Sequence, residues 1–336
     1  MTSCCARRSW AFNKKEVTMS DKILVTGTSV RKELLKPLVE AGFVVENPTH
    51  LLSEDELAAA LADKAGYLLG GDEFATAKAL QGAKKLKIIA FLGMGYQSFI
   101  DADAAERCGI AVTNTPGTLS NAVAEFTIGL LLNSTRRIHQ YALAYSEGNS
   151  GKEEKQRDLA NLHVGIVGLG GIGTRIAEIL RWGINCPVSY FSRTRKPAEE
   201  ARLGLTYRPL DELSESVDVL IVMTPGNPET RGLIGRRQFD RFRPGLILIN
   251  SARAEIVDPT ALLDALSSGK LGYAAFDGFY EQAEIAAAAK LLIPARLMIT
   301  GHIASLTSDA RDAMANRAVA SIINMIKFGK DAYRVR

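Results

Sequence analysis

Three glycines, at positions 168, 170 and 173, have a spacing that could bind a phosphate group. They lie in LHVGIVGLGGIGTRIAEIL, where an apolar run precedes the glycines and a helix-like pattern follows them. A strand, a tight glycine turn and a helix N-terminus form the pyrophosphate site of dinucleotide-binding domains, and a glycine-rich turn of another α/β protein is the alternative. The residues expected to line this site are Gly168, Leu169, Gly170, Gly171, Ile172 and Gly173.

A basic segment follows the glycines at the distance where such domains meet the adenosine ribose. It reads YFSRTRK, and Ser192 lies 192 − 173 = 19 residues beyond the last glycine. An NAD-selective site has Asp or Glu about 20 residues on, whereas a guanidinium can bind the 2′-phosphate of NADP through two parallel bonds. Ser192, Arg193 and Thr194 therefore predict NADP(H), with NAD(H) as the weaker cofactor. The alternative is a solvated basic loop.

The elements that position these residues follow an alternating strand and helix pattern from residue 21 onward, which is typical of α/β proteins with parallel sheets. A first series of strand-like runs ends near residue 116, and a second series begins with the strand before the glycines. Two runs, NAVAEFTIGLLLNSTRRI and SLTSDARDAMANRAVASIINMIKFG, have the periodicity of long helices. The other expected strands are KILVTG, YLLGG, LKIIAFLGMG, GIAVTNTPG, PVSYFS, VDVLIVMTP, GLILIN, GYAAFDG and RLMITGH.

Composition excludes several classes of function. The 336 residues are 47% hydrophobic, and 41 Lys and Arg against 37 Asp and Glu give a formal charge of +4 without a basic stripe, so a nucleic-acid partner is not expected. No apolar run is long enough to span a membrane, and no metal site is predicted. The four cysteines form no CxxC pair, which favours a cytoplasmic location. Residues 1–19, before and up to a second Met, are expected to be a disordered extension.

Six motifs, in order between Lys22 and Phe328, resemble the D-isomer-specific 2-hydroxyacid dehydrogenases. They are LKIIAFLGMG, AVAEFTIGLLL, GLGGIG, TPGNPETRGLIG, GLILINSARAEIVDPTALLDALSSGKLGYAAFD and MITGHIASLT. The resemblance implies reduction of a small 2-oxo acid to a D-2-hydroxy acid, and the basic segment makes NADPH the expected reductant. It also implies two Rossmann-like, doubly wound parallel-sheet domains. A cofactor domain of residues 119–302 would be inserted into a flavodoxin-like substrate domain of residues 20–118 and 303–336.

The same resemblance assigns roles to individual residues. Arg253 would bind the substrate carboxylate and polarise its carbonyl group, and His302 would transfer the hydroxyl proton, as an imidazole that titrates near neutrality can. Asp277 would lie beside the nicotinamide carboxamide. Backbone N–H groups around Met94 and Gly95, and less securely at Gly70 and Gly71, would bind the carboxylate. Further cofactor contacts would come from Thr224, Pro225, Thr230, Ser251 and Ala252.

The sequence departs from the family pattern beside the expected imidazole. The family has a Glu five residues after the Asp, hydrogen-bonded to the His, but here that position is Gln282, and Glu281 lies one residue earlier. A carboxylate beside an imidazole favours its charged form, whereas an amide only orients it. Either residue is therefore a candidate catalytic partner. Gln282 leaves open a formate- or phosphonate-type relative, and a nucleotide-sensing binding protein of the same fold is a further alternative. Gly301 and Ala254 replace the family's usual Pro and Gly.

The helix NAVAEFTIGLLLNSTRRI has more apolar surface than one domain needs. In the family this region forms a two-fold dimer, so the resemblance implies a homodimer. The alternative is a helix buried within the monomer.

Overall fold

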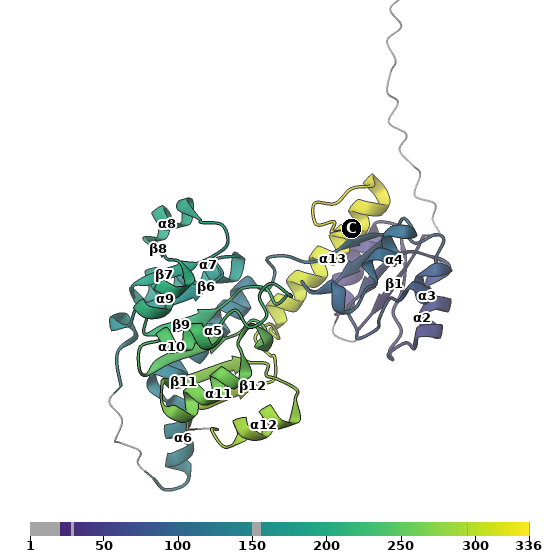
Figure 1. Cartoon of the computed structure of the whole chain (residues 1–336). Coiled ribbons are helices and arrows are strands. Elements are labelled where there is room, and N and C mark those ends of the chain that lie inside the picture. The colour runs from purple at the N-terminus through teal and green to yellow at the C-terminus, as the bar shows by residue number, and fades with distance from the viewer. Residues whose placement is uncertain (1–20, 28–29, 150–155, 294, 336) are drawn as a thin grey trace, which may run out of the picture. The chain divides into compact units, whose positions relative to one another are not determined.

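The computed structural model describes residues 21–27, 30–149, 156–293 and 295–335 (Figure 1). The chain divides into unit 1, Met1–Pro116 with Arg311–Arg336, and unit 2, Gly117–Ala310. The expected disordered extension at residues 1–19 lies outside the described residues.

Unit 1 is built on a five-stranded parallel sheet of order β2-β1-β3-β4-β5. This is the strand order of flavodoxin-like folds. The apolar runs predicted as strands are buried on both faces, as parallel strands covered by helices must be. The strands are β1 (Lys22–Thr26), β2 (Val44–Glu46), β3 (Lys64–Leu69), β4 (Ile88–Phe91) and β5 (Ala111–Thr113).

Helices cover both faces of this sheet. The long C-terminal helix α13 (Ser308–Phe328) packs Val319 and Ile322 against Ile23 and Ile88 on one face, and Figure 1 shows it in yellow beside the purple strands. The opposite face packs against α2, α3 and α4. The remaining elements of unit 1 are η1 (Lys32–Leu35), α1 (Lys36–Glu40), α2 (Glu54–Leu61), α3 (Ala77–Gln81), η2 (Tyr96–Ser98) and α4 (Ala102–Arg107).

Unit 2 contains a seven-stranded parallel sheet of order β12-β11-β10-β9-β6-β7-β8. The strand order reverses between β6 and β9, and ligands of doubly wound sheets bind at the carboxyl ends of the strands at such a point. The strands are β6 (Val164–Val167), β7 (Val188–Phe191), β8 (Thr206–Tyr207), β9 (Val219–Val222), β10 (Leu246–Asn250), β11 (Leu271–Asp277) and β12 (Leu297–Thr300).

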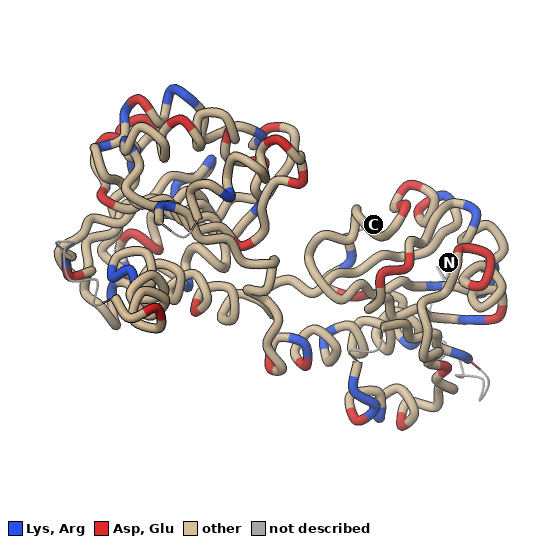
Figure 2. The backbone as a smooth tube through the Cα atoms, turned by 90° about the horizontal axis from the view of Figure 1, so that it is seen from below, with Lys and Arg blue, Asp and Glu red and all other residues tan. Residues whose placement is uncertain are grey.

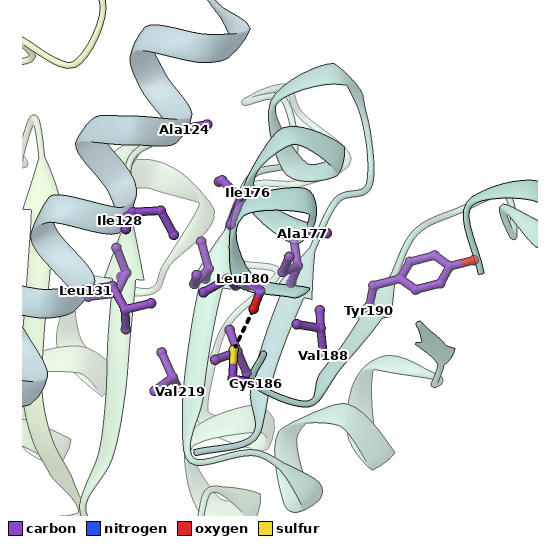
Figure 3. Close-up of a cluster of buried hydrophobic side chains, with 14 of the residues drawn as sticks. Ala124, Ile128, Leu131, Ile176, Ala177, Leu180, Cys186, Val188, Tyr190 and Val219 are labelled. Carbon is purple, nitrogen blue, oxygen red and sulfur yellow. Dashed lines mark hydrogen bonds between the residues drawn. The ribbon is translucent and has the colours of Figure 1, made fainter. Parts of the chain in front are cut away.

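Two hydrophobic layers hold the helices of unit 2 to its sheet. One packs α5 and α7 on β6 and β7, where Cys186 Sγ donates to the Leu180 carbonyl oxygen at 3.7 Å (Figure 3). Burial there raises the pKa of the Cys186 thiol to about 11. The other layer packs α9, α10 and α11 on the opposite face. The elements are α5 (Ser120–Arg136), α6 (Ile138–Ser146), η3 (Leu159–Asn161), α7 (Gly171–Glu178), the π-helix η4 (Ile179–Ile184), α8 (Pro197–Leu203), α9 (Leu210–Ser216), α10 (Arg236–Arg241), η5 (Ala254–Ile256), α11 (Pro259–Ser268) and α12 (Ala283–Lys290).

The predicted fold class, two doubly wound parallel-sheet α/β domains, is confirmed, but some element boundaries differ. The helix expected through residue 138 breaks at Arg137 (φ 51°), whose guanidinium donates to the carbonyl oxygen of Gly272 and lies 4.3 Å from the Tyr273 ring centre. In unit 1, α2 ends at Leu61, and Lys64 already belongs to β3. Its buried ammonium lies 2.9 Å from a carboxylate oxygen of Glu46 on β2.

Charged residues of both signs alternate over each unit, and Figure 2 shows no run of blue segments that would form a basic stripe on the part of the chain it colours. Among the described residues, no helix is both long and apolar enough to cross a membrane.

Candidate active site

The glycine turn predicted from the sequence lies between β6 and α7, at the carboxyl edge of the unit 2 sheet. Gly168 has φ 106°, and a β-carbon there would lie 2.7 Å from the amide nitrogen of Thr224. A β-carbon at Gly173 would overlap the carbonyl oxygen of Gly168, so helix and turn touch without side chains. Gly170 faces open space instead. The turn therefore leaves backbone N–H groups and the start of α7 accessible to an anion, as a pyrophosphate requires.

A buried hydroxyl lies at the same edge of the sheet. Ser251, the residue after β10, has a buried Oγ with no hydrogen-bond partner among the described residues. An unsatisfied buried polar group is costly and is commonly explained by a missing ligand or water. The other predicted cofactor residues lie on the loops after β9 and β10. These are Thr224, Pro225, Thr230 and Ala252. The residues present thus fit a dinucleotide.

The basic segment forms the tip of β7, as predicted, but the side chains of Ser192, Arg193 and Arg195 already make contacts within the protein. The guanidinium of Arg195 donates to both carboxylate oxygens of Glu200, and the hydroxyl of Tyr190 donates to the same carboxylate at 2.6 Å. These bonds from Arg195 and Tyr190 lower the pKa of Glu200 to about 2. Ser192 Oγ donates to the Thr194 carbonyl oxygen at 2.6 Å, which removes that hydroxyl as a free donor to a phosphate.

Arg253 and His302, 49 residues apart in the chain, meet at the carboxyl ends of β10 and β12. Nη1 of Arg253 lies 3.4 Å from Nε2 of His302. Both side chains are exposed, so a solute can reach them. Because a guanidinium only donates, the contact assigns the acceptor role to Nε2. A cation that binds carboxylates therefore lies next to a group that can transfer a proton.

Asn250 holds the turn that carries Arg253. It is the last residue of β10 and is 1% exposed. Its Nδ2 donates to the Arg253 carbonyl oxygen at 3.0 Å, and its Oδ1 accepts from the Ala252 amide at 3.0 Å. A buried amide with both ends satisfied orients a loop firmly. The family resemblance assigns no role to Asn250, although a polar residue that ends a buried strand is a signal visible in the sequence.

Asp277 ends β11, and its carboxylate is 4% exposed. It accepts from the Thr300 hydroxyl at 2.7 Å and from the amides of Ile303 and Ala304, each at 2.8 Å. The three donors flank His302 in the chain, and His302 has a left-handed φ of 58°. Such a conformation is uncommon outside glycine and persists only where its surroundings enforce it. Asp277 therefore orients the loop that carries the imidazole, whereas its predicted contact with a carboxamide stays a prediction.

Glu281 and Gln282, the candidate partners of His302, immediately precede α12, and both are exposed. Gln282 is the N-cap residue of this helix and accepts through its carbonyl oxygen from the Ala286 amide at 3.0 Å. In the described part of the chain, no hydrogen bond or ion pair joins either side chain to His302. Gly278 lies close to the imidazole, because a β-carbon at position 278 would be 3.4 Å from Nδ1 of His302.

The predicted carboxylate-binding backbone groups belong to unit 1. Met94 and Gly95 follow β4, and the Met94 side chain is 50% exposed. Gly71 lies against Glu73, a buried acid that sequence reasoning did not single out, and a side chain at position 71 would overlap that carboxylate. Gly70 follows β3 directly. Within the described residues, no group of three or more His, Cys, Asp or Glu is placed to hold a metal ion.

Comparison with known proteins gives a consistent result. Residues 128–304 match the model of the D-isomer specific 2-hydroxyacid dehydrogenase NAD-binding domain. The chain is 32% identical over 300 residues to glyoxylate/hydroxypyruvate reductase B of Shigella boydii serotype 4 (strain Sb227), covering 88% of this chain and 92% of the relative. It is 35% identical over 255 residues to a glyoxylate reductase of Pyrococcus furiosus (strain ATCC 43587 / DSM 3638 / JCM 8422 / Vc1), covering 72% of this chain and 74% of that protein.

Solved structures show the same fold. The TT0316 protein of Thermus thermophilus matches with a TM-score of 0.79 at 31% identity, over 94% of this chain and 100% of that one. Apo D-lactate dehydrogenase of Escherichia coli matches with a TM-score of 0.79 at 25% identity over the same shares. Together with the glycine turn and the Arg253–His302 pair, these matches define a nicotinamide-dependent oxidoreductase. The chain belongs to the D-isomer-specific 2-hydroxyacid dehydrogenase family.

Proposed function

We propose that this protein reduces a small 2-oxo acid to the corresponding D-2-hydroxy acid and that it uses NADPH as the preferred cofactor. The contact between Arg253 and His302 carries the proposal, because a carboxylate-binding guanidinium beside an acid–base imidazole suits this substrate class. The names of the relatives, glyoxylate and hydroxypyruvate reductases, support a compact acid.

Each residue of the site contributes a distinct step. Arg253 binds the carboxylate and withdraws electron density from the adjacent carbonyl group. Bound nicotinamide supplies the hydride. His302 delivers a proton to the carbonyl oxygen as it becomes a hydroxyl, and Asp277 keeps the imidazole loop in place for that transfer.

A substrate panel tests this proposal. Oxidation of NADPH is followed by absorbance with glyoxylate, hydroxypyruvate, phenylpyruvate, branched 2-oxo acids and phosphonopyruvate. We expect turnover with at least one acid, a large loss of kcat/KM in Arg253→Ala, and a loss dominated by kcat in His302→Asn. NADPH binding without turnover on any acid would favour the nucleotide-sensing alternative, and turnover on formate instead would favour the formate-type alternative.

We also propose that the protein forms a homodimer through α5 and α6. α5 buries much of its apolar surface within unit 2, as the monomer alternative requires, but large apolar side chains of both helices remain exposed. They are Leu132 (39%), Ile138 (55%), Leu143 (40%) and Tyr145 (80%). Light scattering should show a dimer that Ile138→Asp with Leu143→Asp converts to monomer. A monomeric wild-type protein would refute this proposal.

A further inference from the structure

The basic tip of β7 meets an acid from a separate loop. Nη1 of Arg193 lies 3.1 Å from a carboxylate oxygen of Glu229, and the two side chains are 84% and 74% exposed. Glu229 belongs to the turn after β9, and β7 and β9 both neighbour β6. The ion pair therefore connects the loops on either side of the strand that leads into the glycine turn.

The turn that presents Glu229 is fixed by its own side chains. Asn227 Oδ1 accepts from the Glu229 amide at 2.9 Å and from the Thr230 amide at 3.1 Å. Thr230 Oγ1 donates to the Pro225 carbonyl oxygen at 2.7 Å. Local side-chain bonds of this kind hold a turn in one conformation. The carboxylate of Glu229 is thus offered at the tip of β7 by a preformed loop.

The neighbours of Arg193 on the tip are less available to a ligand. Arg195 makes three hydrogen bonds to Glu200, whose side chain is only 13% exposed, and the Ser192 hydroxyl donates within its own turn. An exposed ion pair such as Arg193–Glu229 is weak, at about 0–1 kcal/mol, so a ligand can replace one partner. A phosphate can therefore bind the guanidinium of Arg193 more readily than that of Arg195.

We propose that Glu229 sets the cofactor preference, an inference that rests on the proposed use of NADPH. The tip itself lacks the acid that binds ribose hydroxyls in NAD-selective domains, and Glu229 supplies one from the next loop. With NADH, the carboxylate accepts a ribose hydroxyl. With NADPH, the 2′-phosphate binds Arg193 in place of Glu229. The Glu229 carboxylate stays nearby and repels the phosphate, which weakens binding. The site therefore accepts both cofactors, with only a modest preference for NADPH.

Dissociation constants measured without substrate test this inference. NADPH and NADH are titrated into the full chain and followed by nucleotide fluorescence, in the wild type, Glu229→Gln, Arg193→Ala and the double variant. Asp264→Asn is the matched control, because it removes the acid of another exposed Arg–carboxylate pair, with Arg236, in the same unit. We expect Glu229→Gln to tighten NADPH about three- to tenfold and to weaken NADH about two- to tenfold.

The outcomes separate this inference from the proposal on which it rests. Arg193→Ala should weaken NADPH about ten- to a hundredfold with little change for NADH. If it does so while Glu229→Gln leaves the ratio of the two constants within about twofold of the control, the role of Glu229 is wrong but the use of NADPH stands. If Arg193→Ala leaves the ratio unchanged, the proposed NADPH preference fails and this inference fails with it. Equal weakening of both cofactors by Glu229→Gln would also overturn the inference.

Discussion

The carboxylate of Asp277 accepts hydrogen bonds from the two amides that follow His302 in the chain, each at 2.8 Å. The acid at the end of β11 thereby holds the backbone that follows His302 after β12, while the imidazole itself stays exposed. In the proposed reaction, this arrangement separates orientation, by Asp277, from proton transfer to the substrate, by His302.

Asp277→Asn tests this separation. The amide can accept at only one of its two ends, so one of the amides of Ile303 and Ala304 loses its acceptor. A hydrogen bond to a charged group contributes about 1.5–3 kcal/mol, so we expect kcat to fall about ten- to a hundredfold and Tm to decrease. Thr300→Val is the control, because it removes one donor and leaves both amide bonds. An Asp277→Asn enzyme with wild-type kcat would show that the loop needs no such anchor.

The activity should also depend on the small size of Gly226, because this residue lies against the aliphatic part of the Arg253 side chain. A β-carbon at position 226 would lie 2.7 Å from Cγ of Arg253 and 2.7 Å from a carboxylate oxygen of Glu255. Gly226→Ala must therefore shift the guanidinium, and we expect kcat/KM for the 2-oxo acid to fall about ten- to a hundredfold. Gly183→Ala, where the added carbon meets nothing within 4 Å, should leave kcat/KM unchanged. Equal activity of both variants would contradict the placement of Arg253.

A pH–rate profile decides between Glu281 and Gln282 as partner of His302. A carboxylate that approaches the imidazole extends reduction to higher pH, because it stabilises the protonated ring. If Glu281 fills this role, Glu281→Gln shifts the alkaline fall of kcat to lower pH. If Gln282 fills it, Gln282→Glu shifts that fall to higher pH. Profiles that coincide with the wild type in both variants would remove both residues from the mechanism.

Glu200 makes stability depend on pH. Arg195 and Tyr190 lower its pKa from 4.5 to about 2 in the folded chain. The stabilisation is therefore complete above the ordinary carboxyl pKa and is lost as the pH falls toward about 2. We expect Glu200→Gln to lower Tm at neutral pH, with a difference from the wild type that shrinks steadily below about pH 4.5. A Tm difference that stays constant from neutral pH to pH 3 would contradict this linkage; Asp264→Asn controls for the loss of an exposed pair.

The sequence predicted those parts of the molecule that depend on local patterns. Gly168, Gly170 and Gly173 could be assigned because a dinucleotide-binding turn has glycine at each of these positions, and the structure shows the steric requirement at Gly168 and Gly173. The buried strands were predicted because their apolar runs are continuous. β2 and β8 were not predicted, because these short edge strands are partly exposed, whereas the equally short edge strand β5 is fully buried.

Contacts between segments far apart in the chain could not be predicted from local sequence patterns. The strand tip contains no acid, so the sequence predicted a phosphate site without a nearby carboxylate. In the structure, Glu229, which is 36 residues away in the chain, contacts Arg193. The break at Arg137 depends on carbonyl groups near β11 that no local window contains. The proximity of Arg253 and His302 was inferred from family resemblance, since nothing in their spacing alone requires it.

The most direct test of the central claim follows the hydride itself. The protein is incubated with NADPH carrying deuterium at the transferred position and with the best acid of the panel whose product has a stereocentre at carbon 2, which glyoxylate does not give. The product is analysed by NMR and chiral chromatography. Deuterium on carbon 2 of a D-2-hydroxy acid, formed by the wild type and lost in Arg253→Ala, is the predicted result. An L-configured or unlabelled product, or full labelling by the Arg253→Ala variant, would contradict the assignment of this site.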